Sequence, residues 1–170
     1  MRGRSDVHRL LPPLLQAFCD VAKLNTENWL LPNSSPRFID VCAAVIERDH
    51  RILVARRSEK MHLAGKWEFP GGKVEAGETL AACIVREMLE ELGMTVGNPQ
   101  CLTVVEHADS DHCVRLHFLR CDAQDPADHD PREHDEVRWV THAELAQLDL
   151  APADRRFVNW FLADRRFANA

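Results

Sequence analysis

Three glutamates near the middle of the chain have the spacing of a metal site. Glu87, Glu90 and Glu91 lie in a stretch of helical periodicity, and at about 100° per residue their side chains fall on one stripe of a helix. Glu87 and Glu91 are like charges at i and i+4, which destabilises a helix by roughly a few tenths of a kcal/mol unless a cation neutralises them. Carboxylate oxygens suit Mg²⁺, which also binds water and phosphate oxygens. We therefore predict a magnesium site on this stripe.

A glycine-containing loop precedes the predicted helix. Gly71 and Gly72 follow the string Trp67–Pro70, and a loop without side chains lets the backbone approach a phosphate or a metal closely. Glu78 stands before the helix, where its charge suits the helix dipole, and it can pair with Arg86. The alternative is a solvated acidic face that Arg86 supports, but the loop and Glu78 favour a site.

The helix that must position the glutamates is bounded by Gly77 and Gly93, and we predict it over about residues 79–92. Its apolar residues recur at helical spacing on the stripe beside the glutamates, so this stripe is predicted to face the core. The apolar residues of the stripe are Ala81, Ile84, Val85, Met88 and Leu92.

The chain from Phe38 onward alternates between strand-like and helical patterns. Asp49-His50 marks a turn between the first two strands, which predicts a hairpin, and residues 122–135 are predicted as a loop. Strands interspersed with helices predict an α/β sandwich around a mixed sheet. The predicted strands are 41–46, 52–54, 102–105, 114–119 and 137–140, and the further helices are 142–148 and 152–163.

Residues 1–37 differ from the rest and are predicted to form an N-terminal extension to a domain of residues 38–170. A helical stripe follows Pro12-Pro13, and residues 33–36 are typical of a linker. The extension packs on the domain, pairs with a second subunit or is loosely ordered, so both a monomer and a homodimer remain open. The stripe consists of Leu14, Leu15, Phe18, Val21 and Ala22.

The composition limits the classes of partner. A net charge of −6 argues against a nucleic-acid polymer, although a cation can still hold a small anionic ligand. No run of about 18 apolar residues is present, so no membrane span is expected, and no signal peptide is predicted. We expect a cytoplasmic protein with reduced cysteines. Cysteines in apolar runs, predicted to lie in the core, are Cys42, Cys83, Cys101 and Cys113.

The central stretch resembles the Nudix box, G-x5-E-x7-R-E-U-x-E-E-x-G-U, in which U is a bulky aliphatic residue. No fixed position is missing. The resemblance implies a Nudix fold, an α/β/α sandwich around a mixed sheet, with bound Mg²⁺ or Mn²⁺. It also implies cleavage of a nucleoside diphosphate linked to another group. The matching residues are Gly72, Glu78, Arg86, Glu87, Met88, Glu90, Glu91, Gly93 and Met94.

The same resemblance implies roles for these residues. Glu87, Glu90 and Glu91 would be metal ligands, together with the carbonyl of Gly71. Arg86 would orient the carboxylates. The residues that would support the site are Gly72, Glu78 and Gly93.

Residues 38–163 further resemble the MutT branch of this family, which includes 8-oxo-dGTP diphosphatases and NudG-type CTP pyrophosphohydrolases. In that branch a fourth carboxylate comes from the loop before the last strand, where Glu133 is the match and Glu136 the rival. Arg57 matches a phosphate-contacting arginine, and Lys73 is a second candidate, although both also suit a solvated surface. The strings that carry the resemblance are 39–49, 53–57, 64–73, 133–139 and 150–154.

Asp154 bears on the substrate. The resembling 8-oxo-dGTP diphosphatases usually have Asn here, at the start of the last helix, whereas NudG-like sequences have Asp. An ionised aspartate can only accept hydrogen bonds, so it favours a donor-rich base edge, such as the cytosine amino group or the N1–H and amino group of guanine. Capping of the helix is the alternative role. Phe69 and Phe38 are candidates to line a base pocket, with ordinary core packing as the alternative.

These features together predict a nucleoside triphosphate pyrophosphohydrolase that releases a nucleoside monophosphate and pyrophosphate from a normal or oxidised (d)NTP, as in sanitation of the nucleotide pool. Either Glu133 or a glutamate of the box would act as general base. The alternatives are another Nudix substrate, such as ADP-ribose, a dinucleoside polyphosphate or a capped RNA end, and a non-catalytic nucleotide-binding domain.

Overall fold

The computed structural model describes residues 38–108, 113–124 and 133–164. Its contacts divide the chain into two compact units, Met1–Pro36 and Arg37–Ala170. The predicted N-terminal helix lies outside the described residues, as does much of the predicted loop 122–135. No helix in the described ranges is long and apolar enough to span a membrane.

The described domain is built on a mixed sheet, as predicted. The strand order is β3-β2-β1-β5-β4, with β6 paired to the other edge of β2. β1 and β5 run parallel, and the other pairs are antiparallel. The strands are β1 (Ile39–Arg48), β2 (Arg51–Arg57), β3 (Trp67–Glu68), β4 (Val96–Ala108), β5 (Cys113–Ala123) and β6 (His134–Thr141).

The predicted hairpin between the first two strands is confirmed. Asp49 and His50 connect β1 to β2, and both have positive φ, 48° and 58°. Two central residues of positive φ are the pattern of the type I′ turn, whose twist matches that of the strands it joins. The hairpin sets the register of β2, the strand that carries Arg57 to the edge of the site.

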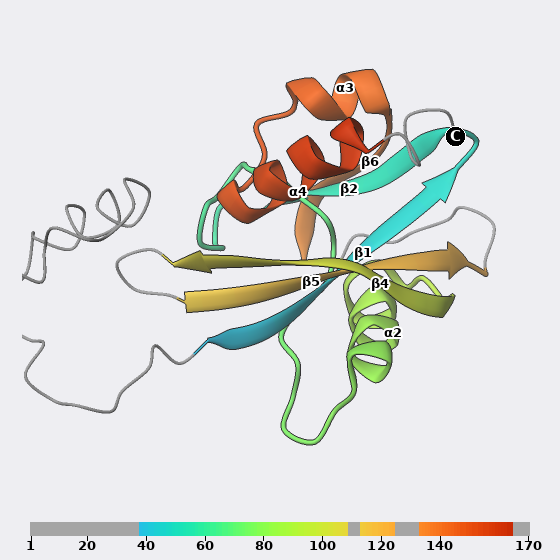
Figure 1. Cartoon of the computed structure of the whole chain (residues 1–170), viewed down its shortest axis with the longest axis vertical. Coiled ribbons are helices and arrows are strands. Elements are labelled where there is room, and N and C mark those ends of the chain that lie inside the picture. The colour runs from blue at the N-terminus through green and yellow to red at the C-terminus, as the bar shows by residue number, and fades with distance from the viewer. Residues whose placement is uncertain (1–37, 109–112, 125–132, 165–170) are drawn as a thin grey trace, which may run out of the picture. The chain divides into compact units, whose positions relative to one another are not determined.

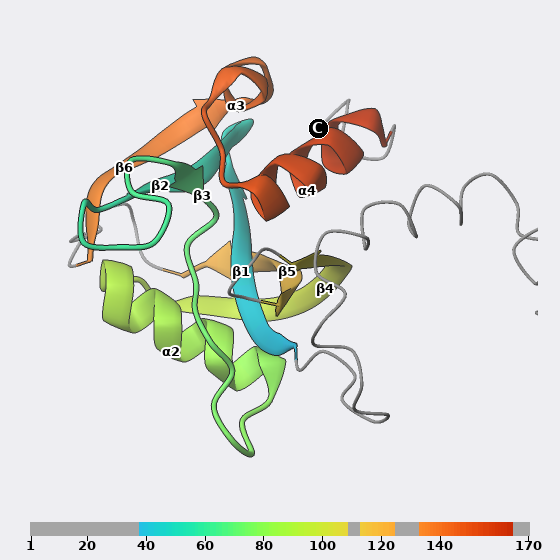
Figure 2. The same ribbon diagram turned by 90° about the vertical axis from the view of Figure 1, so that its left-hand side faces the viewer.

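Helices cover the sheet on opposite sides, and Figures 1 and 2 show α2 away from α3 and α4. The helices are α2 (Leu80–Leu92), α3 (His142–Gln147) and α4 (Pro152–Ala163). Alternate residues of β1 face the two layers: Ala43 and Val45 pack with α4, whereas Cys42, Ala44 and Ile46 pack with α2. The predicted three-layer sandwich is thus confirmed.

The helix α2, which carries the three glutamates, begins and ends at the predicted places. The Thr79 side chain accepts a hydrogen bond from Ala82 N at 3.1 Å, a typical N-cap. Gly93 ends the helix in the left-handed conformation, with φ 63°. Both caps are sequence-local, so the bounds of the helix were accessible to prediction.

The predicted core stripe of α2 is wrong in part. Ala81 and Val85 are exposed, Val85 to 37%, whereas Glu91 is buried. The helix is rotated so that Glu91 turns toward the sheet, where the backbone of Gly71 binds it. The described cysteines are all free, and Cys101 is exposed because its strand, β4, is at an edge of the sheet. The core prediction is therefore also wrong for Cys101.

Candidate active site

The loop before α2 is attached to β1 by backbone hydrogen bonds. Ala44 N donates to Pro70 O and Cys42 N donates to Gly72 O, each at 2.8 Å. Between these two bonds the chain passes so close to β1 that a Cβ on Gly71 would lie 2.2 Å from the Cys42 carbonyl oxygen. Only glycine fits this position, and its φ of 146° also disfavours a side chain.

We expect Gly71→Ala to lower the free energy of unfolding by about 2 kcal/mol, because the new methyl group meets a backbone atom that cannot move aside. Urea unfolding followed by fluorescence measures the change. Gly77→Ala is the matched control, because Gly77 also has positive φ, 82°, but a Cβ there meets nothing within 4 Å. Equal losses in the two variants would contradict the close approach of loop and strand.

Arg86 gathers the acidic side chains of the site, as the sequence predicted. Its Nε and Nη2 atoms contact both oxygens of Glu78, at 2.9 and 2.8 Å. Its Nη1 atom donates to Glu87 at 2.7 Å and to Glu90 at 3.1 Å, while Nη2 also reaches the Lys73 carbonyl at 3.1 Å. These hydrogen bonds, with one from the backbone N–H of Glu75, lower the pKa of Glu78 to about 2. One guanidinium therefore ties the loop to the helix.

Glu91 is held differently from the other two glutamates. Its side chain is buried, and Oε2 accepts a hydrogen bond from Gly71 N at 3.0 Å. Burial raises the pKa of Glu91 to about 8; the charges of Glu68 and Glu87 add to this rise, and His134 and the Gly71 N–H oppose it. A positive charge close to this buried carboxyl group would lower its pKa and favour the ionised form.

Gly72 leaves room for the carboxylate of Glu87. A Cβ on Gly72 would lie 2.3 Å from the Cδ and Oε1 atoms of Glu87, so that carboxylate packs directly on the glycine backbone. Within the described ranges, the Gly71 carbonyl oxygen accepts no backbone hydrogen bond. The loop thus brings a free carbonyl oxygen and two carboxylates, those of Glu87 and Glu91, to the same short segment.

The donors fit a hard divalent cation. All are oxygens, and burial disfavours the charge of Glu91 unless a cation compensates it. Among the described residues no three His, Cys, Asp or Glu side chains are already arranged around one point, because Arg86 holds Glu87 and Glu90 while Gly71 N holds Glu91. Arg86 contacts one oxygen of Glu87 and one of Glu90, so each carboxylate has a second oxygen that could bind a cation.

Two residues that the sequence analysis did not single out lie beside Glu91. Glu68 forms an ion pair with Arg57 through Oε2 and a hydrogen bond with His134 through Oε1, the latter at 3.1 Å from Nε2. Burial acts to lower the pKa of His134, but the Glu68 hydrogen bond and the charges of Glu91 and Glu68 raise it above its usual value. Arg57, the predicted phosphate contact, is therefore partnered by a carboxylate.

The two candidates for a fourth carboxylate occupy different places. Glu133 is exposed and directly precedes His134, which is close enough to Glu91 to affect its pKa. Glu136 lies within β6, forming ion pairs with Arg56 and Arg138. Arg138 stacks over Trp67, which belongs to the core on the α4 side of the sheet. Of the two, Glu136 is thus already paired with arginines, whereas Glu133 is exposed.

Asp154 does not cap its helix, so that alternative is wrong. α4 has Ala151 as its N-cap residue with no side-chain hydrogen bond. Asp154 instead points inward, fully buried, and Oδ1 accepts a hydrogen bond from Phe69 N at 2.9 Å. Burial raises the pKa of Asp154 to about 7. This contact joins α4 to the string that precedes the glycine loop.

The aromatic candidates are separated. Phe69 is in the core, where its ring packs edge-on against Phe118 and Phe157 with centroids 5.7 and 5.0 Å away. Phe38 is half-buried at the start of β1, and the Arg115 guanidinium lies 5.3 Å from its ring centroid. The Phe69 ring is thus largely committed to the core, which leaves its backbone for other contacts.

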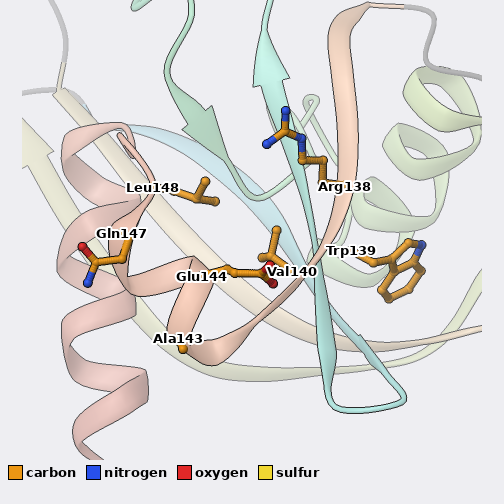
Figure 3. Close-up of a pocket in the computed structure, with 7 residues that line it drawn as sticks. All are labelled: Arg138, Trp139, Val140, Ala143, Glu144, Gln147 and Leu148. Carbon is orange, nitrogen blue, oxygen red and sulfur yellow. The ribbon is translucent and has the colours of Figure 1, made fainter.

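A surface hollow of about 560 Å³ lies on β6 and α3, and Figure 3 shows the side chains that line it. None of the predicted site residues lines it. The converging carboxylates, rather than this hollow, mark the place where chemistry is expected. The lining residues are Arg138, Trp139, Val140, Ala143, Glu144, Gln147 and Leu148.

Known proteins resemble this chain over most of its length. A protein of Mycobacterium tuberculosis (strain CDC 1551 / Oshkosh) named "Putative 8-oxo-dGTP diphosphatase 2" is 39% identical over 127 residues, covering 69% of this chain and 84% of that protein. The CTP pyrophosphohydrolase of Escherichia coli (strain K12) is 36% identical over 132 residues, covering 76% and 95%. The crystal structure of a MutT protein from Methanosarcina mazei Go1 superposes with a TM-score of 0.67, at 28% identity, covering 81% of this chain and all of that one.

The family is also identified directly, because residues 36–161 match the family model described as NUDIX domain. Nudix hydrolases generally use divalent metal ions and act on small nucleotide substrates, in keeping with the acidic site on α2. The resemblance to the MutT branch that the sequence indicated is confirmed. The chain belongs to the Nudix hydrolase family.

Proposed function

We propose that this protein is a magnesium-dependent nucleoside triphosphate pyrophosphohydrolase, which converts a (d)NTP and water into a nucleoside monophosphate and pyrophosphate. The observation that carries the proposal is the set of glutamates that Arg86 and the Gly71 backbone hold on one side of α2. The relatives named as 8-oxo-dGTP diphosphatase and CTP pyrophosphohydrolase support this substrate class. A role in the cytoplasm, in removing damaged nucleotides before DNA synthesis, would follow.

The residues that would hold Mg²⁺ are Glu87, Glu90, Glu91 and Glu133 with the Gly71 carbonyl; Mn²⁺ would suit the same oxygens. When bound, the cation neutralises phosphate charge and lowers the pKa of a coordinated water.

Other parts of the mechanism belong to the chain itself. Arg86 keeps Glu87 and Glu90 oriented, and its contact with Glu78 keeps the loop in place. Glu133, exposed at the start of β6, would take the proton from the attacking water. Lys73 is exposed on the glycine loop and would contact phosphate. Arg57 would also contact phosphate while it keeps its ion pair with Glu68.

Asp154 is proposed to select the base, with its side chain held by a hydrogen bond from the backbone of Phe69. Its Oδ1 atom accepts a hydrogen bond from Phe69 N, and Oδ2 would accept one from a donor on the nucleotide. With a pKa of about 7, the side chain is an acceptor above neutrality and a donor when protonated. Donor-rich base edges, those of cytosine and guanine, are therefore expected to be preferred at alkaline pH.

We expect Asp154→Asn to change the ratio of kcat/KM between cytidine and 8-oxoguanine nucleotides by about tenfold, because an amide presents both a donor and an acceptor. Pyrophosphate release is measured over normal, oxidised and methylated (d)NTPs, with ADP-ribose and a dinucleoside polyphosphate alongside. Asp149→Asn is the control, since Asp149 is exposed and pairs with Lys66.

The same panel tests the function itself. Turnover of ADP-ribose or a dinucleoside polyphosphate without turnover of any (d)NTP would replace the proposed substrate class. Cleavage of a capped RNA end alone would do so as well. Nucleotide binding without turnover in magnesium would instead indicate a non-catalytic domain. An unchanged substrate ratio in Asp154→Asn would remove Asp154 from base selection while leaving the reaction class intact.

A further inference from the structure

His134, the first residue of β6, is a buried histidine beside the site. Only 1% of its side chain is exposed, and Nε2 lies 3.1 Å from Glu68 Oε1. Its other ring nitrogen, Nδ1, is buried with no hydrogen-bond partner among the described residues. Burial of a polar ring atom without a hydrogen bond costs free energy, so the other contacts of such a ring are expected to serve the fold or the site. The question is what the bond to Glu68 holds in place.

Glu68 connects His134 to a second strand. Its Oε2 atom forms the ion pair with Arg57, the last residue of β2, so one carboxylate joins the ends of β2, β3 and β6. At the same place the pairing of β2 with β6 is irregular, with a register shift between Arg56 and Arg57. His134 still pairs with Arg57 beyond this shift, and its side-chain bond to Glu68 adds a second contact that fixes the start of β6.

The anchored point lies between two carboxylates of the proposed metal site. On one side, Glu68 lies three residues before Gly71, whose N–H binds Glu91 at 3.0 Å, so the His134 bond reaches the segment that holds that buried side chain. On the other side, Glu133 directly precedes His134 and is exposed. A shift of the ring would therefore move Glu133 relative to Glu91.

We propose that His134 is a positioning residue, whose hydrogen bond to Glu68 sets the place of Glu133 opposite Glu91. It touches neither nucleotide nor metal and acts through Glu133. This inference rests on the proposed function, in which Glu133 completes the metal site. The alternative is that His134 only fills space in the core. The two roles differ in whether a conservative replacement restores kcat.

Two substitutions at His134 separate these roles. His134→Leu removes the hydrogen bond but fills space, and it is expected to lower kcat about 30-fold with KM changed less than about threefold. His134→Gln, whose amide can still donate to Glu68, is expected to recover kcat to within about threefold of the parent. A filler of the core would be replaced by Leu at least as well as by Gln.

His142 provides the matched control. It too has a buried ring nitrogen without a hydrogen bond, Nε2, which lies 3.9 Å from Glu47. It belongs to α3, on the other side of the sheet from the α2 glutamates. His142→Leu should leave kcat unchanged. If it lowers kcat as much as His134→Leu, loss of a buried histidine is a general defect and the proposal is wrong.

A double substitution tests the route through Glu133. If His134 acts by placing that carboxylate, His134→Leu combined with Glu133→Gln should lose no more kcat than the worse single variant. Multiplicative losses would show that His134 acts elsewhere and would overturn the proposal. Should His134→Leu fail to fold, the cycle with His134→Asn, whose shorter amide cannot reach Glu68, decides the same question.

Measurement of manganese binding tests the positioning role independently of the proposed reaction. Mn²⁺ titration followed by electron paramagnetic resonance should give about tenfold weaker binding in His134→Leu and parental binding in His134→Gln. If the parent hydrolyses no (d)NTP, the proposed function fails, yet this difference in Mn²⁺ affinity still supports positioning. If the parent turns over (d)NTPs and His134→Leu keeps both kcat and Mn²⁺ affinity, the positioning role alone is wrong.

Discussion

Replacing Glu90 by Gln is expected to lower magnesium-dependent kcat by about 10³-fold. The amide keeps the size of the side chain and can still accept the hydrogen bond from Arg86 Nη1, at 3.1 Å in the parent. It removes one negative charge from the set that would hold the cation, and an interaction of this kind with the reacting centre contributes roughly 10²–10³ in rate or more. Pyrophosphate release at saturating nucleotide and magnesium measures the loss.

The matched control for this prediction is Glu75→Gln. Glu75 is an exposed glutamate of the loop before α2, so its replacement changes the net charge equally without touching the proposed ligands. Its kcat should stay within about twofold of the parent, since surface substitutions usually have small effects. Full turnover in Glu90→Gln would remove the stripe on α2 as the catalytic metal site.

Without metal, the free energy of unfolding is expected to fall as the pH rises from about 5 to about 8. The pKa of Glu91 is near 4.5 in an unfolded chain and about 8 in the folded protein, chiefly because of burial. Between these values the folded state binds a proton that the unfolded state has released. The stability from this proton is complete below pH 4.5 and is lost through pH 8. The expected loss is on the order of 4 kcal/mol.

Urea unfolding in EDTA across this pH range measures the effect. Glu91→Gln should flatten most of the slope, because the amide does not titrate; the remainder belongs to groups such as Asp154, whose pKa is also raised by burial. Magnesium should reverse the loss at high pH, since it binds the ionised carboxylate of Glu91. A metal-free protein that gains stability from pH 5 to pH 8 would contradict the burial of Glu91.

The helix that carries the three glutamates was predictable because its signals are local in sequence. Thr79 and Gly93 mark the ends of α2, and helical geometry then fixes the relative directions of Glu87, Glu90 and Glu91. What periodicity does not determine is which of two adjacent stripes faces the core. Val85 was assigned to the core and is exposed, because the Gly71 backbone draws the Glu91 side of the helix inward.

The remaining features depend on contacts between distant segments. Glu68 and His134 meet only because β3 and β6 pair with opposite edges of β2, next to an irregular step in the ladder. A two-residue strand and a bulge leave little trace in hydrophobic periodicity. The position of Asp154 just after Pro152 suggests a helix cap, yet the N-cap of α4 is Ala151, three residues earlier. Its burial against Phe69 is a tertiary contact.

The hydrogen bonds of Arg86 have a consequence for how the protein matures. One guanidinium contacts Glu78, Glu87 and Glu90, so part of the acidic charge has a counterion within the chain. Mutual repulsion of these side chains therefore opposes formation of α2 less than their number suggests. The helix can therefore form before a cation binds, and in the proposed function metal loading would be a step separate from folding.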